Sequence, residues 1–379
     1  MLVDGGMGGT TPCTTMSYRD RDGDGFGSGT PRAVCGPGWV PVPGDCNDRD
    51  ALTFPGATEV CNGIDDDCNS QIDEGRCLDA GWTAVDDLRS PGNDFVASAS
   101  FDPGSLWITA GPKVFIRRSE LGFADVSSSC PVNLKAVWSE PSGDAEVGGG
   151  TGGAGRIAEQ SFAATACSNQ RVVSEPPVAM VGFPDGISSQ YVGVLQDGRL
   201  LRWHRGQAPI LSGTNLAPSA QVTDLHGTSS TQLFAVGSTL NGNRRRPMAW
   251  SFQADGGWKE ELTASFGNNN GDARLLGVWA LGASRAVAVG ENGTVYTRSL
   301  TSWRSVSGDT SSDLTSVRAF STGRFYVTTS DGRVRRRVGS TWQTVFRTDA
   351  GTALTDLSAT SEEDLWAVGL DGVIGRGPH

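Results

Sequence analysis

The sequence predicts an all-β protein in which seven repeated units form a circular array. A strand from the N-terminal side closes the array, and a small loop-rich module precedes it. Three observations support this prediction. A unit of roughly 40 residues recurs after residue 94, the last copy lacks a strand that is found before the first copy, and acidic residues and cysteines are concentrated before residue 80. Helical periodicity is absent.

The first 79 residues differ in composition from the rest of the chain. They contain 14 acidic residues and 5 arginines, which gives a net charge of −9 out of the chain's −11. Six of the eight cysteines also lie here: Cys13, Cys35, Cys46, Cys61, Cys68 and Cys77. An even set of cysteines in a short segment with little apolar material is typical of a disulfide framework, which persists outside the reducing cytosol. We therefore expect an extracellular or bacterial cell-envelope protein.

The N-terminal segment shows no export signal of its own. The stretch "MLVDGGMGGTTPC" has neither a basic region nor an apolar core. Its glycine and threonine content is typical of a flexible linker, which we assign to residues 1–17. Such linkers follow the lipid-modified cysteine of bacterial lipoproteins, so we expect the signal, and with it a lipid anchor, to lie upstream of a secreted or surface-anchored chain. No stretch reaches the roughly 18 apolar residues of a transmembrane segment.

From residue 80 to residue 379 the chain consists of repeats. Each unit has an apolar start, a polar turn, a segment of the type "AVGxxGxV" and then a Trp-x-x-Val strand. The units start at Leu275, Leu314 and Leu354 in the clearest copies, and near Phe95, Leu134, Val178 and Val222 in the weaker ones. Alternating apolar residues and "DG", "NG" and "GG" pairs favour short antiparallel strands joined by hairpins. The period is that of propeller blades.

The last unit predicts how the ring closes. It stops at His379 before any Trp-x-x-Val strand, whereas "GWTAVDD" at residues 81–87 supplies such a strand before the first unit. Pairing the two removes two free sheet edges. These repeats resemble the "VWG…AVG…G" propeller repeats of bacterial exported proteins, which are similar to photosystem-assembly-factor and sialidase-type propellers. The seven units predict a seven-bladed β-propeller, and the resemblance implies that it acts as an interaction platform.

The acidic module, residues 18–79, contains a candidate cation loop. Asp20, Asp22 and Asp24 alternate and are followed by Gly25 and Phe26. This is the spacing of the first half of an EF-hand loop, in which three side-chain oxygens precede a glycine turn and a backbone carbonyl. The position of the closing Glu is Pro31, so other oxygens must complete the site. The acidic runs further along the module are the candidates, and the first of them contributes Asp45, Asp48 and Asp50.

A second run, "IDDDCNSQIDE", repeats this pattern. Its candidate ligands are Asp65, Asp67, Asn69, Gln71, Asp73 and Glu74, with Ser70 where glycine is preferred. Residues 18–75 together resemble the MopE-type metal-binding repeat, in which acidic triplets and cysteines recur in this order. Ser70 departs from the family's usual glycine.

Calcium is the metal we favour for both loops. Oxygen ligands at this spacing suit a hard cation, whereas copper prefers imidazole nitrogen or sulfur. The histidines, at positions 204, 226 and 379, all lie outside the module, and its cysteines are expected in disulfides. Copper, after which the family is named, and a simple solvating acidic segment remain the alternatives. Few large apolar side chains are available, so we expect the metal to fold the module rather than to catalyse a reaction.

The cysteines are all expected to be oxidised. Cys130 and Cys167 are the only two in the propeller and should pair with each other. The six others allow 15 pairings. Proximity in sequence favours Cys35–Cys46 and Cys61–Cys68.

No motif for catalysis or nucleotide binding stands out. The chain has no G-x-S-x-G, H-E-x-x-H or Walker sequence, and "GGGTGG" at 148–153 is interpreted as a low-complexity loop. The arginine runs at 243–247 and 332–339 are interpreted as solvated strand faces, so no nucleic-acid partner is expected, and His204 and His226 as core or rim residues. We expect a monomeric, non-enzymatic adhesion or recognition protein with an extracellular protein or glycan as its ligand. A propeller hydrolase or lyase acting on glycans is the alternative.

Overall fold

A computed structural model describes ten ranges of the chain: residues 15–51, 53–57, 65–70, 82–118, 122–151, 154–185, 188–241, 244–262, 273–348 and 351–377. In these ranges the regular structure is β-strand, apart from two short 3-10 turns, η2 (Glu291–Gly293) and η4 (Leu370–Gly372). Nothing in them is a helix long and apolar enough to cross a membrane. The chain divides into two compact units, residues 1–80 and 81–379.

The first unit contains a small sheet whose strands are β1 (Ser17–Arg19), β2 (Ser28–Arg32) and β3 (Trp39–Val40), in the order β2-β1-β3. Strand β1 begins one residue inside the predicted linker. It pairs antiparallel with both neighbours, for example Arg19 with Ser28 and with Trp39. The turn between β1 and β2 is the predicted first cation loop. Its glycines Gly23 and Gly25 have φ of +88° and +96°, a conformation that other residues rarely adopt.

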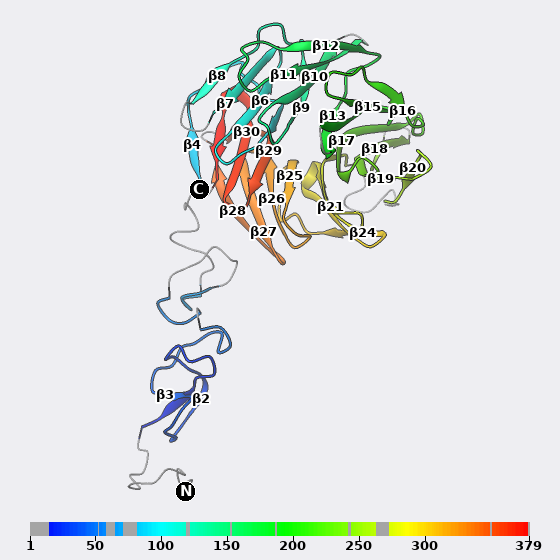
Figure 1. The fold of residues 1–379 in the computed structure, drawn as a ribbon. Helices are drawn as coiled ribbons and strands as arrows, with labels where there is room; N and C mark the ends of the chain where they lie inside the picture. Colours follow the sequence, from blue (N-terminus) through cyan, green and yellow to red (C-terminus); the bar gives the residue numbers. More distant parts are fainter. Residues whose placement is uncertain are drawn as a thin grey trace. The chain divides into compact units, whose positions relative to one another are not determined.

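The second unit contains four-stranded antiparallel sheets arranged as in a propeller (Figure 1). The innermost strands are β5 (Ala97–Ala99), β9 (Leu134–Ser139), β13 (Ala179–Asp185), β17 (Ala220–Ser229), β21 (Leu275–Gly282), β25 (Leu314–Ala319) and β29 (Leu354–Ser361). The second strands are β6 (Leu106–Ala110), β10 (Ala145–Thr151), β14 (Ser188–Val194), β18 (Gln232–Asn241), β22 (Arg285–Gly290), β26 (Arg324–Thr329) and β30 (Asp364–Gly369). The third strands are β7 (Lys113–Arg117), β11 (Ala154–Gln160), β15 (Leu200–His204), β19 (Arg244–Phe252), β23 (Thr294–Ser299), β27 (Arg333–Val338) and β31 (Ile374–Arg376). The outer strands are β8 (Phe123–Asp125), β12 (Ser168–Val173), β16 (Ile210–Ser212), β20 (Trp258–Glu260), β24 (Ser302–Val306), β28 (Thr341–Arg347) and β4 (Thr83–Val85).

Each innermost strand begins at, or within two residues of, a unit start that the repeat pattern predicts. Successive innermost strands contact one another, and β29 contacts β5. The innermost strands therefore surround a common axis.

Side chains on the innermost strands connect several neighbouring sheets. Thr315 Oγ1 donates a hydrogen bond to the Leu354 carbonyl at 2.8 Å. Thr355 Oγ1 donates to the Phe95 carbonyl at 2.9 Å, which connects the last sheet to the first. The neighbouring carboxylate of Asp356 accepts the backbone N–H of Ser98 at 2.7 Å. These bonds satisfy polar groups at the strand edges, where an unpaired group would be costly.

Strand β4, which precedes the first blade in the sequence, completes the last sheet. Strand β4 pairs antiparallel with β31, with Val85 opposite Ile374 and Thr83 opposite Arg376. Trp82, just before β4, packs its indole against Phe346 with ring centroids 5.5 Å apart. The predicted pairing of residues 81–87 with the last unit is confirmed.

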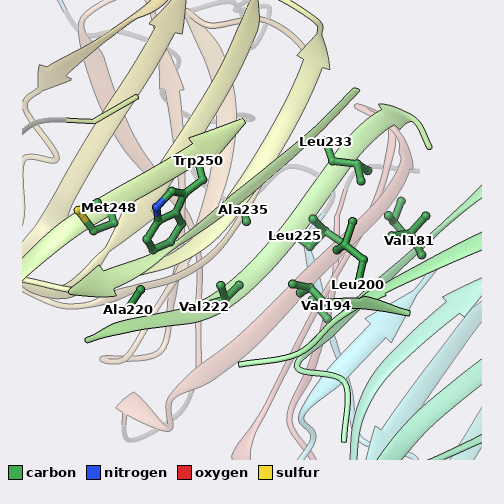
Figure 2. Packing of buried hydrophobic residues seen from close by; sticks show 12 residues of the cluster. Val181, Val194, Leu200, Ala220, Val222, Leu225, Leu233, Ala235, Met248 and Trp250 are labelled. Atoms are coloured by element: carbon green, nitrogen blue, oxygen red, sulfur yellow. The ribbon is translucent and has the colours of Figure 1, made fainter. Parts of the chain in front are cut away.

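Apolar side chains fill the spaces between successive sheets. Figure 2 shows one such cluster, in which Val194 and Leu200 of one sheet face Val222, Leu225 and neighbouring residues of the next. Elsewhere Trp107 and Trp366 are fully buried. Strands β6 and β30 are buried at every position, because neighbouring sheets cover both of their faces, and their sequences are accordingly almost continuously apolar.

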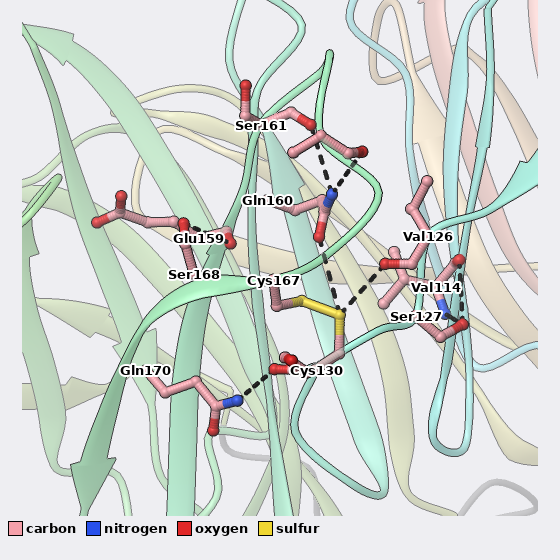
Figure 3. Close-up of a disulfide and its surroundings, with 12 residues drawn as sticks. Val114, Val126, Ser127, Cys130, Glu159, Gln160, Ser161, Cys167, Ser168 and Gln170 are labelled. Atoms are coloured by element: carbon pink, nitrogen blue, oxygen red, sulfur yellow. Dashed lines mark hydrogen bonds between the residues drawn. A yellow bond between two sulfur atoms is a disulfide. The ribbon is translucent and has the colours of Figure 1, made fainter.

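The propeller disulfide is also confirmed. Cys130 and Cys167 are bonded, with Cα atoms 4.8 Å apart (Figure 3). The Cys167 N–H donates to the Ser128 carbonyl at 2.8 Å, so the two loops are joined by the backbone as well. The bridge ties the connection between β8 and β9 to the loop before β12.

The pairings expected in the first unit are wrong. Cys46 is bonded to Cys68, 22 residues away, so neither Cys35–Cys46 nor Cys61–Cys68 can form. The backbone explains this, because Phe54 and Gly56 donate hydrogen bonds to the Asp66 and Asp67 carbonyls and bring the two loops together. Contact between segments, and not distance along the chain, decides the partner. Every described cysteine, Cys35 included, is in a disulfide.

The glycine run is a strand and not the loop that we expected. Gly148 to Gly150 lie in β10 and pair with β11, and the first two of them also pair with β9. A Cβ at Gly149 would lie 2.4 Å from the Asn133 carbonyl oxygen, and one at Gly148 would lie 2.8 Å from Pro177. Close neighbours therefore require glycine here.

The second arginine run is not a solvated face. Arg335 and Arg336 on β27 are each 7% exposed. Arg335 pairs with the exposed Asp309 at 3.0 Å and lies over the Trp342 ring, so its buried guanidinium has both a charged and an aromatic partner. In the first run, Arg244 and Arg245 are exposed, as expected.

Candidate metal centre

Two loops of the first unit bring carboxylates together. The turn after β1 provides Asp20, Asp22 and Asp24, and the segment after β3 provides Asp45 and Asp48. Ligand atoms of Asp20, Asp22 and Asp24 lie within 4.8 Å of one another, and so do those of Asp22, Asp45 and Asp48. Asp22 belongs to both groups. We refer to these five residues as the aspartate cluster.

Backbone hydrogen bonds fix several carboxylates of the cluster. The Gly23 N–H donates to Asp20 Oδ1 at 2.7 Å, and the Phe26 N–H donates to Asp24 Oδ1 at 2.8 Å. The Asn47 N–H donates to Asp45 Oδ1 at 2.7 Å. The second carboxylate oxygen, Oδ2, of Asp24 and of Asp45 accepts neither of these bonds.

Asp48 joins the two loops. Its Oδ1 accepts the Arg21 N–H at 2.9 Å, and its Oδ2 accepts the Ser28 hydroxyl at 2.9 Å and pairs with the Arg21 guanidinium at 3.3 Å. Sequence reasoning missed this role of Arg21 and Ser28, because 27 and 20 residues separate them from Asp48 and no local pattern links them.

Four buried carboxylate oxygens in the cluster accept no hydrogen bond from the part of the chain that the structure describes. They are both oxygens of Asp22, Oδ2 of Asp24 and Oδ2 of Asp45. A buried charged oxygen without a partner is costly, and native proteins compensate such groups with partners or metal ions. The cluster therefore fits a bound cation.

The electrostatics agree with this interpretation. Burial raises the pKa of Asp24, and the charges of Asp22, Asp20 and Asp48 raise it further. The pKa of Asp45 is likewise raised, by burial first and then by Asp24, Asp22 and Asp48. A positive ion among these carboxylates would reverse both shifts.

The other predicted ligands of this region are placed as follows. The Phe26 ring stacks on Phe54 at 5.3 Å, and ligation by its carbonyl stays a prediction. Asp50 is not one of the clustered residues.

The second predicted loop is built differently in its described part. Asp65 accepts the N–H groups of Asn69 and Ser70, and Asp67 accepts the Asn69 N–H and side-chain amide. Ser70 has φ of +72°, the left-handed conformation for which glycine is preferred. Gln71, Asp73 and Glu74 lie outside the described residues. A cation at this loop stays a prediction.

The propeller axis forms a second candidate region, a cavity of about 370 Å³ lined by the innermost strands. Among its lining residues are Asp224, His226, Trp279, Arg318 and Asp356, none of which the sequence singled out as a site. His226 stacks on Trp279 at 3.8 Å between ring centroids, and the Arg318 guanidinium lies 4.5 Å from that ring.

The polar groups of this cavity are committed to the scaffold. Asp224 accepts the N–H groups of Leu225 and Val278, both at 2.8 Å. The Ala280 N–H donates to His226 Nδ1 at 3.0 Å. Burial lowers the pKa of His226 to about 3, so its ring stays neutral, and burial raises the pKa of Asp224 to about 7.

A family model named for the copper-binding protein MopE, with the description "Putative metal-binding motif", matches residues 45–74. The module carries a MopE-type metal-binding motif. The matched range contains Asp45 and Asp48 of the aspartate cluster, whereas Asp20, Asp22 and Asp24 precede it. No curated protein matches the chain.

Solved structures similar to this chain are β-propellers. "YCF48 bound to D1 peptide" has a TM-score of 0.59 at 12% identity and covers 79% of this chain and 97% of its own. YCF48 from Cyanidioschyzon merolae has a TM-score of 0.60 at 13% identity, with coverage of 79% and 99%. A streptogramin B lyase has a TM-score of 0.61 at 13% identity, with coverage of 78% and 96%. At this identity the likeness concerns the fold alone.

Proposed function

We propose that the chain is an exported calcium-binding protein whose first unit is folded by metal ions and whose propeller serves as a recognition or adhesion platform. The seven four-stranded sheets would be the complete set of blades. One observation carries the proposal: four buried carboxylate oxygens of the aspartate cluster have no hydrogen-bond partner in the described chain.

Calcium fits the cluster better than copper does. All five ligand side chains are carboxylates, which suit Ca²⁺, Mg²⁺ and Mn²⁺. The sulfur atom nearest to the cluster in sequence, that of Cys46, is bonded to Cys68, and Cys35 is also in a disulfide. Copper would therefore lack its preferred ligands at this cluster.

Calcium would contribute to the stability of the first unit. Binding to the folded form alone adds about 2.7 kcal/mol when the free metal is 100-fold above Kd. Sites with Kd on the order of 10⁻⁴ M are typical of extracellular calcium modules. The role proposed for the ion is thus structural.

The propeller is proposed to bind an extracellular protein or glycan without catalysis. Asp224 and Asp356 use both carboxylate oxygens to hold backbone or hydroxyl donors, and His226 accepts a backbone N–H. A general acid or base needs a free proton site within reach of a substrate. A structural neighbour is described as bound to a peptide, which supports a propeller of this fold as a recognition surface. A screen for polysaccharide hydrolysis or lyase activity, run beside a glycan and protein binding array, tests this part, and any turnover contradicts it.

Isothermal titration calorimetry of the full chain tests the metal assignment. We expect Ca²⁺ to give binding heat, Asp22→Ala to reduce it strongly, and Cu²⁺ to give none at the cluster. Asp102→Ala removes an exposed carboxylate from the propeller and is the matched control, with binding unchanged. Absence of calcium heat, or equal heat in Asp22→Ala, would overturn the assignment.

A further inference from the structure

The aspartate cluster presents two sets of ligand atoms and not one. In the described chain, the carboxylates that lie within 4.8 Å of one another form two triplets, and no larger set meets that limit. The first triplet consists of Asp20, Asp22 and Asp24, and the second of Asp22, Asp45 and Asp48. Oxygens bound to one Ca²⁺ lie 2.3–2.6 Å from it, so a single ion draws its ligands around one point. The two triplets indicate two points.

The unpartnered oxygens are distributed evenly between the two triplets. Asp24, whose Oδ2 is unpartnered, belongs to the first triplet alone, and Asp45, whose Oδ2 is unpartnered, belongs to the second alone. Asp45 is only 7% exposed. Asp22, which the triplets share, has both of its oxygens buried and without a hydrogen bond in the described chain. One oxygen is thus available to each triplet, which is the arrangement of a carboxylate that bridges two metal ions.

The charge of the cluster matches two divalent ions. Its five carboxylates carry −5, and the Arg21 guanidinium, 3.3 Å from Asp48, reduces this to −4. One Ca²⁺ would leave −2 among buried oxygens, whereas two leave the cluster neutral. Uncompensated charge among buried groups is costly.

We infer that the aspartate cluster binds a pair of divalent cations bridged by Asp22. The first ion is held by Asp20, Asp22 and Asp24 and the second by Asp22, Asp45 and Asp48. This inference rests on the proposed calcium binding and extends it. The pair spans residues 20–48, so the MopE-type motif at 45–74 supplies only part of the second ion's ligands.

Counting calcium ions on the full chain tests the pair. Native mass spectrometry in calcium-containing buffer gives the number of ions bound to wild type and to three isosteric variants. We expect Asp22→Asn to lose two ions, and Asp24→Asn and Asp45→Asn to lose one each. A loss of one ion in Asp22→Asn overturns the bridged pair while leaving calcium binding intact. Wild type that binds no calcium overturns the proposed function as well.

A second measurement tests the pair in the wild-type protein itself, so that its main result does not depend on the folding of a variant. Wild-type protein loaded with Mn²⁺ is examined by electron paramagnetic resonance. Ions in a bridged pair lie about 3.5–4 Å apart, so the spectrum should show spin coupling. The same spectrum should be uncoupled for Asp45→Asn, which retains one ion. Isolated Mn²⁺ signals in fully loaded wild type contradict the inference.

Discussion

The closing contact between Trp82 and Phe346 can be tested by a double-mutant cycle. These residues are far apart in sequence and meet only if the N-terminal strand completes the last sheet. Trp82 is half-buried, and it also covers Gly377, where an added Cβ would lie 3.0 Å from the indole. Full burial makes Trp→Ala cost about 3–5 kcal/mol, so the partial burial of Trp82 predicts a loss of about 2–3 kcal/mol. Phe346→Ala should cost about the same.

The coupling energy between Trp82 and Phe346 tests the contact more directly than the loss in either single variant. Aromatic pairs contribute about 0.5–1.5 kcal/mol beyond their buried area, so the double variant should be less destabilised than the sum of the single variants by about 1 kcal/mol. Urea unfolding monitored by tryptophan fluorescence and by circular dichroism gives all four free energies of unfolding. Thr83→Ala, on the exposed face of β4, is the control and should change stability by less than about 0.5 kcal/mol. Additive losses at positions 82 and 346 would refute ring closure through this contact.

Three further predictions concern the propeller. Burial raises the pKa of Glu146 to about 7 despite its ion pair with Arg171, so the stability that this group contributes is present below about pH 4.5 and lost as pH rises through 7. Relative to wild type, Glu146→Gln should therefore be more stable at pH 8 than at pH 5, by about 2 kcal/mol in urea melts, and an equal difference at both values would contradict this. Replacing Cys130 and Cys167 together by alanine opens a loop with a sequence separation of 37 and should cost about 3–4 kcal/mol, measured by thermal melting beside dithiothreitol-treated wild type. Asp356→Asn puts an amide donor against donors that the carboxylate now accepts and should cost about 1–3 kcal/mol, whereas the exposed Asp102→Asn should be neutral.

Much of the propeller could be predicted from the sequence because every unit needs the same pattern of apolar residues and turn residues. Leu275, Leu314 and Leu354 start inner strands at the expected positions, since the apolar alternation and the turn pairs fix both strand and hairpin. The last unit lacks a Trp-x-x-Val strand, and this absence correctly predicted that the strand near residue 83 would pair with it. The glycine strand was misinterpreted, because a requirement for close neighbours at Gly149 is visible only in three dimensions.

The metal centre was predictable in part. Alternation predicted the carboxylates at positions 20, 22 and 24, and the missing closing Glu indicated that other oxygens must join them. The position of Asp48 depends on contacts made by Arg21 and Ser28, which no local pattern encodes. The predicted cysteine pairings were wrong for the same reason, because contacts between distant segments determine which cysteines meet.

The closing strand also sets the order in which the ring can be completed during synthesis. Ile374 follows its partner Val85 by 289 residues, so at about 5–20 residues per second the ribosome needs roughly 15–60 s to deliver it. Until then β4 has no sheet to join, and the edge of the final blade does not yet exist. A three-residue strand with two exposed side chains is a poor template for pairing with other chains during this interval. The propeller strand that is made first is thus the one placed last, and chains truncated before β31 cannot close the ring.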